Sequence, residues 1–274
     1  YLLGISSVNS AAHLIKCLLP FYCQISVFTY FLFCFILFYF LPFPHEVTQM
    51  HRKKVWILLA GDYSPAPIAP DKEDFVIAVD GGIAYAETCA WTVDLWIGDF
   101  DSSEINAKRS AIVRSTFPSD KSQTDFELAL AYADKHFPNS VLYILGSGGD
   151  EADHEFANLW VLPQIAAPAI LWRNNATIVK AKGKVRNQWQ ASVGDKVSLF
   201  AFDTLQALSY RGLRWTVENA TAEAHIAAFA RNEMQAETAG MSWNSGTALV
   251  FLAPLSLPEI SDDCAESEQK SQTR

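Results

Sequence analysis

The sequence has 274 residues, half of them hydrophobic, which is enough for a well-buried core in one large or two modest domains. The net charge of −9 and the pI near 5.1 argue against a general nucleic-acid binder, because neutralising phosphate backbones needs clustered Lys and Arg. The five cysteines show no CxxC or metal-ligand spacing, which fits a reducing cytosolic compartment.

The N-terminal segment, residues 1–49, is apolar and has two interpretations. Residues 21–41 contain no charged side chain and are about as long as a membrane-spanning helix. With Lys16 before this stretch and a basic run from Arg52 after it, the positive-inside rule leaves the downstream chain in the cytoplasm. The alternative is a misassigned extension, because Met50 stands like a natural start before the first strand. We therefore expect a cytoplasmic catalytic domain, which is membrane-tethered only if the segment is genuine.

An alternating α/β pattern follows and predicts a parallel-sheet nucleotide-binding domain over residues 50–165. Short apolar runs ending in glycine or aspartate predict strands at Val55–Ala60, Phe75–Val79, Leu95–Ile97, Ile112–Val113 and Val141–Leu145. Helices are expected at Ile83–Cys89, from Thr124 to about Lys135, and around Phe156, Leu159 and Trp160 before Pro163. Because the strands are parallel, their terminal loops should meet at one edge of the sheet.

The sequence pattern changes from alternating strands and helices to short strand-like segments after about residue 166. Short alternating segments such as Val197–Phe202, separated by glycine-containing turns, predict a smaller all-β sandwich domain over residues 166–257. The last stretch, residues 258–274, is polar and acidic without apolar periodicity, so we expect a disordered tail.

An aspartate cluster, Gly98–Ser102, directly follows the third predicted strand. In an extended backbone Asp99 and Asp101 project to the same side and supply the hard oxygen ligands that Mg²⁺ prefers. Taken alone, an Asp-x-Asp pair is more often a solvated acidic turn. Its place at a strand end shifts the interpretation towards a metal site.

Other strand-end loops add polar groups to the same edge. Thr124 has the spacing of a capping box, Asp125 follows it, and Lys121 is able to meet a phosphate oxygen. Asp80 precedes a glycine pair, Gly81-Gly82, that permits close approach of the backbone to a ligand. Asp153 and His154 stand at a helix start. Phosphate-loop, GxGxxG, HExxH and GxSxG motifs are absent, which disfavours the common nucleotide folds and hydrolases.

Four motifs taken in order resemble the thiamine pyrophosphokinase family. They are AVDGG at Ala78–Gly82, GDFDS at Gly98–Ser102, DKSQTDFELAL at Asp120–Leu130, and the GG…DHEFANL region at Gly148–Leu159. The similarity extends from about Val55 to Pro254, and four ordered motifs are a far more specific signal than any one of them.

The resemblance implies a transferase of thiamine diphosphate biosynthesis, a kinase that moves pyrophosphate from ATP to the hydroxyl of thiamine with Mg²⁺. It also implies an α/β domain followed by a β-sandwich, in a homodimer with active sites between subunits. On matching positions, the metal ligands and catalytic residues would be Asp99, Asp101 and Asp125. The nucleotide-binding residues would be Asp80, Gly81, Gly82, Lys121, Thr124, Asp153 and His154, and the thiamine-binding residues Asn232, Trp243 and Ser245.

Two departures and two alternatives remain open. Glu151 stands where the family commonly has an arginine, and Arg231 replaces the usual serine before Asn232, so another cation such as Lys121 or Arg231 would have to meet the phosphates. A haloacid-dehalogenase-type phosphatase would instead use Asp99 as a nucleophile. A membrane-tethered nucleotide or metabolite sensor would bind ligand without turnover.

Overall fold

The computed structural model describes residues 52–98, 112–116, 123–149 and 151–261 of the chain. The apolar segment 1–49, the aspartates Asp99 and Asp101, and Lys121 lie outside the described residues, so the predictions made for them stay predictions. Residues 52–261 belong to one compact unit. No helix within the described residues is long and apolar enough to cross a membrane, and the predicted span at 21–41 was outside that search.

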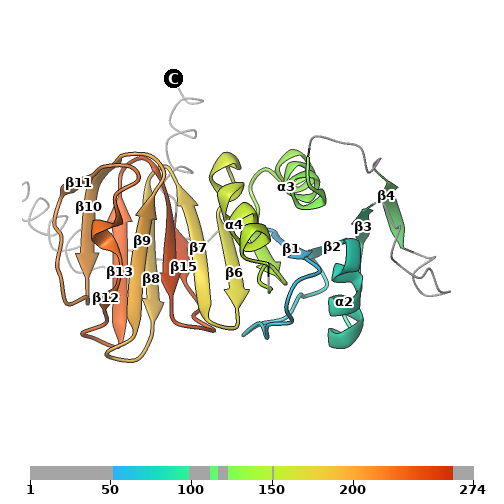
Figure 1. Cartoon of the computed structure of the whole chain (residues 1–274), viewed down its shortest axis with the longest axis horizontal. Helices are drawn as coiled ribbons and strands as arrows, with labels where there is room; N and C mark the ends of the chain where they lie inside the picture. Colours follow the sequence, from blue (N-terminus) through green and yellow to red (C-terminus); the bar gives the residue numbers. More distant parts are fainter. Residues whose placement is uncertain (1–51, 99–111, 117–122, 150, 262–274) are drawn as a thin grey trace, which may run out of the picture. The chain divides into compact units, whose positions relative to one another are not determined.

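A ten-stranded mixed sheet forms the frame of this unit, in the order β12-β9-β14-β7-β6-β5-β1-β2-β3-β4 (Figure 1). Every pairing among the first six strands is parallel, which confirms the predicted parallel sheet. These strands are β1 (Lys54–Leu58), β2 (Phe75–Val79), β3 (Leu95–Gly98), β4 (Val113–Thr116), β5 (Val141–Leu145) and β6 (Ala169–Arg173).

Helices cover both faces of the parallel strands, because these strands are apolar on both sides. Alternate residues of β1 enter different cores: Ile57 packs in one cluster and Trp56 in the other. The first cluster is covered by α3 (Asp125–His136), through Phe126 and Leu130 among others. The second is covered by α2 (Ile83–Cys89), which follows the short 3-10 helix η1 (Asp80–Gly82).

The next helix, α4 (Ala152–Trp160), has no fully buried residue. It ends where predicted, and Pro163 then falls in the 3-10 helix η3 (Leu162–Gln164). Leu159 is partly buried against the core, whereas Phe156 and Trp160 are exposed. Only one edge of this helix therefore packs on the sheet, and its other sides remain available for contacts.

The rest of the chain builds the predicted sandwich. The ten-stranded sheet continues with antiparallel strands β7 (Ala176–Lys182), β9 (Lys196–Ala201), β12 (Asn232–Glu233) and β14 (Thr247–Leu252). A five-stranded sheet contains β8 (Val185–Gln190), β10 (Leu205–Arg211), β11 (Ala220–Ala222), β13 (Thr238–Trp243) and β15 (Glu259–Ser261), and η4 (Ala227–Phe229) is a short 3-10 turn. Inward residues of both sheets share one hydrophobic cluster, with Val250 and Trp189 among its members.

The predicted boundary at residue 166 stays a prediction, but the sheet runs across it without interruption. Strand β6 pairs in parallel with β5 on one side and antiparallel with β7 on the other. The prediction of a disordered tail from residue 258 is wrong at its start, because Glu259–Ser261 form β15 against β8. The reason is that β8 offers an edge with free backbone groups and Ile260 packs partly buried on two cores.

A buried lysine ties the sandwich to the connection that follows α4. The side chain of Lys180, in β7, is fully buried, and its Nζ donates to the carbonyls of Ile165 (2.6 Å), Ala166 (3.4 Å) and Ala167 (2.9 Å). These carbonyls belong to the connection between η3 and β6, where no strand pairing provides hydrogen-bond donors for them. The ammonium therefore fixes the path of the chain between α4 and β6.

Replacing Lys180 with Met should lower the free energy of unfolding by about 2–4 kcal/mol, because buried carbonyls lose their donor and each costs ~1–3 kcal/mol unpaired. Urea denaturation followed by fluorescence measures the loss. Lys182→Met, at an exposed position two residues further along the same strand, is the matched control and should change stability by less than about 0.5 kcal/mol. Equal stability of the two variants would contradict the bracing role.

Candidate active site

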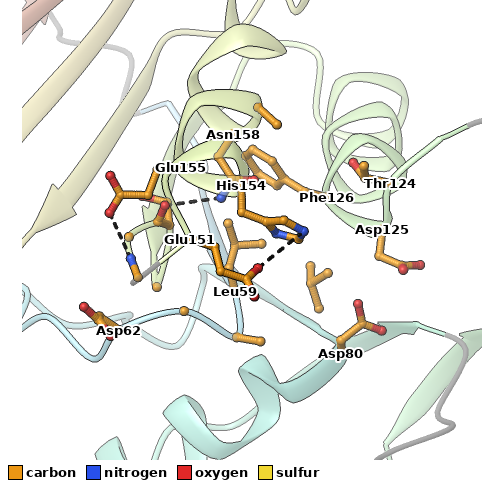
Figure 2. A pocket seen from close by; sticks show the side chains of 18 of the residues that line it. Leu59, Asp62, Asp80, Thr124, Asp125, Phe126, Glu151, His154, Glu155 and Asn158 are labelled. Atoms are coloured by element: carbon orange, nitrogen blue, oxygen red, sulfur yellow. Dashed lines mark hydrogen bonds and ion pairs between the residues drawn. The ribbon is translucent and has the colours of Figure 1, made fainter.

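A pocket of about 910 Å³ lies at the carboxyl ends of the central parallel strands (Figure 2). It is lined by the loop after β1 (59–63), the end of β2 (79–80), the start of α3 (124–126), the loop after β5 (146–149) and one side of α4. The predicted convergence of strand-end loops is therefore observed for the described loops. The loop after β3, which holds the aspartate cluster, begins one residue beyond the described part.

Asp80 occupies a strained position at this edge. Its φ is 45°, a left-handed value that side-chain-bearing residues seldom adopt, and its carbonyl accepts a hydrogen bond from Trp96 Nε1 at 2.9 Å. A Cβ placed on Gly98 would lie 2.1 Å from Asp80 Oδ1, so this carboxylate rests directly on the backbone that leads into Asp99. Asp80 therefore lies beside the strand end that precedes the predicted aspartate cluster, and its predicted contact with a nucleotide remains untested.

The two glycines after Asp80 have packing roles. A Cβ on Gly82 would come 1.9 Å from the carbonyl oxygen of Leu58, so only glycine lets the turn lie against β1. Gly81 is exposed. Neither glycine is among the residues that line the pocket, and the nucleotide contact predicted for them remains untested.

The start of α3 has the predicted capping box. Thr124 Oγ1 accepts a hydrogen bond from Glu127 N at 3.2 Å, while Thr124 N donates to Glu127 Oε2 at 2.8 Å. This fixes the first turn and places Asp125, the first helical residue, in the pocket lining. In Figure 2 the carboxylates of Asp80 and Asp125 lie on one side of the pocket, and Glu155 lies on the other.

The loops after β1 and β5 are joined by backbone hydrogen bonds. Gly61 N donates to Gly146 O at 3.0 Å, and Asp62 N donates to Gly148 O at 2.9 Å. Glycine is required for this approach: a Cβ on Gly61 would lie 1.9 Å from Gly148 O, and Gly146 has a φ of 71°. The floor of the pocket is therefore two chain segments at backbone contact distance.

Helix α4 supplies the remaining wall. Asn158 Nδ2 donates to Ser147 O at 3.2 Å, and Glu155 Oε1 accepts from Gly149 N at 3.0 Å and forms an ion pair with Arg173. His154 lines the pocket with its Nε2 3.9 Å from the Glu151 carboxylate, and both side chains are exposed. Asp153 is exposed and outside the lining, so its predicted nucleotide contact is untested.

The described lining is strongly acidic. Carboxylates come from Asp62, Asp80, Asp125, Glu151 and Glu155, against a single histidine, His154. Hard carboxylate oxygens suit Mg²⁺ in kind, but within the described residues no group of three metal-ligating side chains comes together. A full ligand set thus depends on residues outside them, such as Asp99 and Asp101. The amino ends of α3 and α4 favour anions at the same pocket.

The predicted thiamine residues lie elsewhere in the chain. Asn232 is buried, and its amide group binds the backbone of Trp215 at 2.9 and 3.1 Å and of Glu233 at 2.8 Å. Trp243 is 1% exposed in the sandwich core, while Ser245 is exposed. None of the three lines the described pocket, so their predicted contact with thiamine remains untested.

Several pocket residues were not found by sequence reasoning. The first predicted strand ended at Ala60, so Gly61 and Asp62 were passed over although they match the glycine-acid pattern of the other strand ends. Glu155 and Asn158 have a local signal, since residues three apart share one face of a helix. Arg173, which lies outside this lining and pairs with Glu155, has no local signal, because only the place of β6 beside β5 brings it there.

Comparison with known proteins bears out the resemblance. Residues 69–171 match the family model described as "Thiamin pyrophosphokinase, catalytic domain". The match spans Asp80, Asp125 and the whole of α4, and it disfavours the phosphatase and sensor alternatives. No curated protein matches the sequence at a significant level.

Solved structures show the same fold over most of the chain. Thiamine pyrophosphokinase from Bacillus subtilis is 20% identical with a TM-score of 0.63, covering 74% of this chain and 99% of that one. A thiamin pyrophosphokinase family protein from Enterococcus faecalis is 22% identical, with a TM-score of 0.60 and coverage of 73% and 98%. The enzyme from Candida albicans is 15% identical, with a TM-score of 0.53 and coverage of 74% and 89%. At these identities the likeness concerns the fold, an α/β sheet followed by a β-sandwich.

Gly61→Ala should destabilise the protein by about 2–4 kcal/mol and weaken ligand binding in the pocket, because the new methyl group forces two backbones apart. Thermal unfolding measures the first effect and nucleotide titration the second. Gly149→Ala is the matched control for stability, since a Cβ there meets nothing within 4 Å. A wild-type melting temperature for Gly61→Ala would show that the two loops are not held at backbone contact.

Proposed function

We propose that this chain, which carries the catalytic domain of a thiamin pyrophosphokinase, transfers the terminal pyrophosphate of ATP to the hydroxyl of thiamine. The products are thiamine diphosphate and AMP. The observation that carries the proposal is the meeting in one pocket of Asp80, Asp125, the glycine loop 146–149 and two helix starts, all of which belong to the matched segment.

The polyphosphate of ATP is the group that this pocket suits. The amino ends of α3 and α4 bring backbone N–H groups and helix dipoles towards an anion in the pocket. The carboxylates would repel the same anion unless a cation stood between them. We propose that Asp125, Asp99 and Asp101 hold Mg²⁺, which when bound offsets phosphate charge in this acidic site.

Positioning accounts for most of the proposed catalysis. The thiamine oxygen forms a bond to the β-phosphorus of ATP, the bond from that phosphorus to the α–β bridging oxygen breaks, and AMP leaves with that oxygen. The hydroxyl proton passes to a carboxylate of the pocket. Fixed loops that hold the donor in line reduce the barrier by orientation and charge stabilisation.

The acceptor side of the site is proposed to come from a second copy of the chain. Of the three predicted thiamine residues, Ser245 is exposed and lies outside the described pocket, which would fit a homodimer in which the partner's sandwich completes it, whereas Asn232 and Trp243 are buried in the sandwich. An exposed aromatic surface adjoins the pocket: Phe156 and Trp160 stack on α4 with centroids 5.6 Å apart, and Trp160 meets Phe202 at 6.2 Å. Paired aromatics of this kind are typical of a covered interface.

The activity is tested by incubating the purified protein with Mg²⁺, ATP and thiamine and following both products. We expect AMP to form in step with thiamine diphosphate, and only with all three present. Asp125→Asn should lower kcat by about a hundredfold or more, because a charged group of the pocket is lost with little change in shape. Asp134→Asn, further along α3 and outside the pocket lining, is the control. Thiamine-independent phosphate release would instead support a phosphatase.

The dimer is tested by light scattering after size-exclusion chromatography. We expect twice the mass of the chain for the wild type and a shift to monomer for the double variant Phe156→Ser, Trp160→Ser, since the buried aromatic area is lost. Val193→Ser removes a similarly exposed apolar side chain from a turn of the sandwich and should leave the mass unchanged. A double variant that stays dimeric would place the interface elsewhere.

A further inference from the structure

An ion pair lies behind the glycine loop of the pocket. Arg173, the last residue of β6, is only 9% exposed and pairs with Glu155 of α4. It lines a second, smaller cavity of about 110 Å³, which shares Asp62, Gly148 and Gly149 with the main pocket. A buried guanidinium needs a partner, because leaving its charge unpaired away from water costs several kcal/mol. Its charge is therefore directed at Glu155.

Glu155 links Arg173 to the glycine loop. Its Oε1 accepts the backbone N–H of Gly149 at 3.0 Å. Gly148 lies against the pair itself, since a Cβ there would come 3.2 Å from both Nε and Nη2 of Arg173. On its other side the carbonyl of Gly148 accepts a hydrogen bond from Asp62 N at 2.9 Å. The turn is thus held by the ion pair through Glu155 and by the loop after β1 through Asp62 N.

We propose that Arg173 is a positioning residue that fixes the Gly148–Gly149 turn through Glu155. Charge-assisted hydrogen bonds are the stronger kind, so Glu155 can hold the turn only while its carboxylate is itself held. The turn leads directly into α4 and His154, and its position decides where the phosphate-facing wall of the pocket stands. The effect on catalysis rests on the function proposed above, whereas the effect on the turn does not.

The test compares Arg173→Gln, Glu155→Gln and the double variant in the full-length protein. Each single variant should raise KM for ATP about tenfold, the equivalent of one charged hydrogen bond, with kcat changed less than about twofold. Amide exchange in the peptide that holds Gly148 and Gly149 should quicken to a similar extent. The double variant should be no worse than either single one, because both remove the same link. Arg173→Lys should recover part of the loss.

The pH dependence of the melting temperature is a second test, because a role in packing alone would not change it. Hydrogen bonding from Arg173, then from Gly149 N, lowers the pKa of Glu155 below its ordinary value of 4.5. A lowered pKa stabilises the fold above that value, and this stabilisation is lost as the pH falls through the folded pKa. The melting-temperature advantage of wild type over Glu155→Gln should therefore be present at neutral pH and shrink as the pH falls below 4.5.

Lys54→Gln is the matched control. It breaks the Lys54–Asp71 ion pair at the opposite end of β1 and should leave KM and loop exchange at wild-type values. If Arg173→Gln raises KM while Glu155→Gln leaves it unchanged, Arg173 meets the phosphates directly and the proposal is overturned. Unchanged loop exchange in Arg173→Gln overturns it equally. A wild-type protein without thiamine-dependent AMP refutes the proposed function alone, because exchange still tests the turn.

Discussion

Parallel pairing of the central strands is the constraint on which the rest of the structure depends. Strands that run the same way must be covered by helices on both faces, and all their carboxyl ends meet at one edge. Three loops therefore begin at the same edge, after Leu58, Val79 and Leu145, although nearly 90 residues separate the first from the last. The pocket follows from this arrangement, and its chemistry follows from what the loops contain.

Local signals account for the parts of the fold that sequence predicted. The bounds of β2, α2 and β5 agree with prediction. For the two strands the reason is that apolar runs closed by Asp-Gly or Gly-Ser leave little choice of ending. The capping box at Thr124 was predictable for the same reason: its two hydrogen bonds join residues only three apart. Convergence of these loops needed only the parallel topology, which the alternation of strands and helices supplied.

Long-range pairing accounts for what sequence did not predict. Whether β6 continues the first sheet or begins a new one depends on β7, β14 and β9, and no local pattern encodes that. The strand at Glu259–Ser261 has a polar, acidic sequence, and it forms because the edge of β8 is open to it. Arg173 belongs to the same class, since its role appears only when β6 lies beside β5. The burial of Trp243 likewise depends on the opposite sheet.

The acidic lining explains why this edge is built so rigidly. Carboxylates gathered in one pocket repel one another, so they are held together only where the surrounding backbone is fixed by other means. Here those means are close glycine contacts, a capped helix and the ion pair of the nearly buried Arg173 with the partly exposed Glu155, none of which requires a ligand. Such a frame retains its negative potential without a ligand, and in the proposed function that potential would attract the divalent cation needed to bind a polyphosphate here. The rigid loops are therefore what allows the pocket to keep an acidic lining.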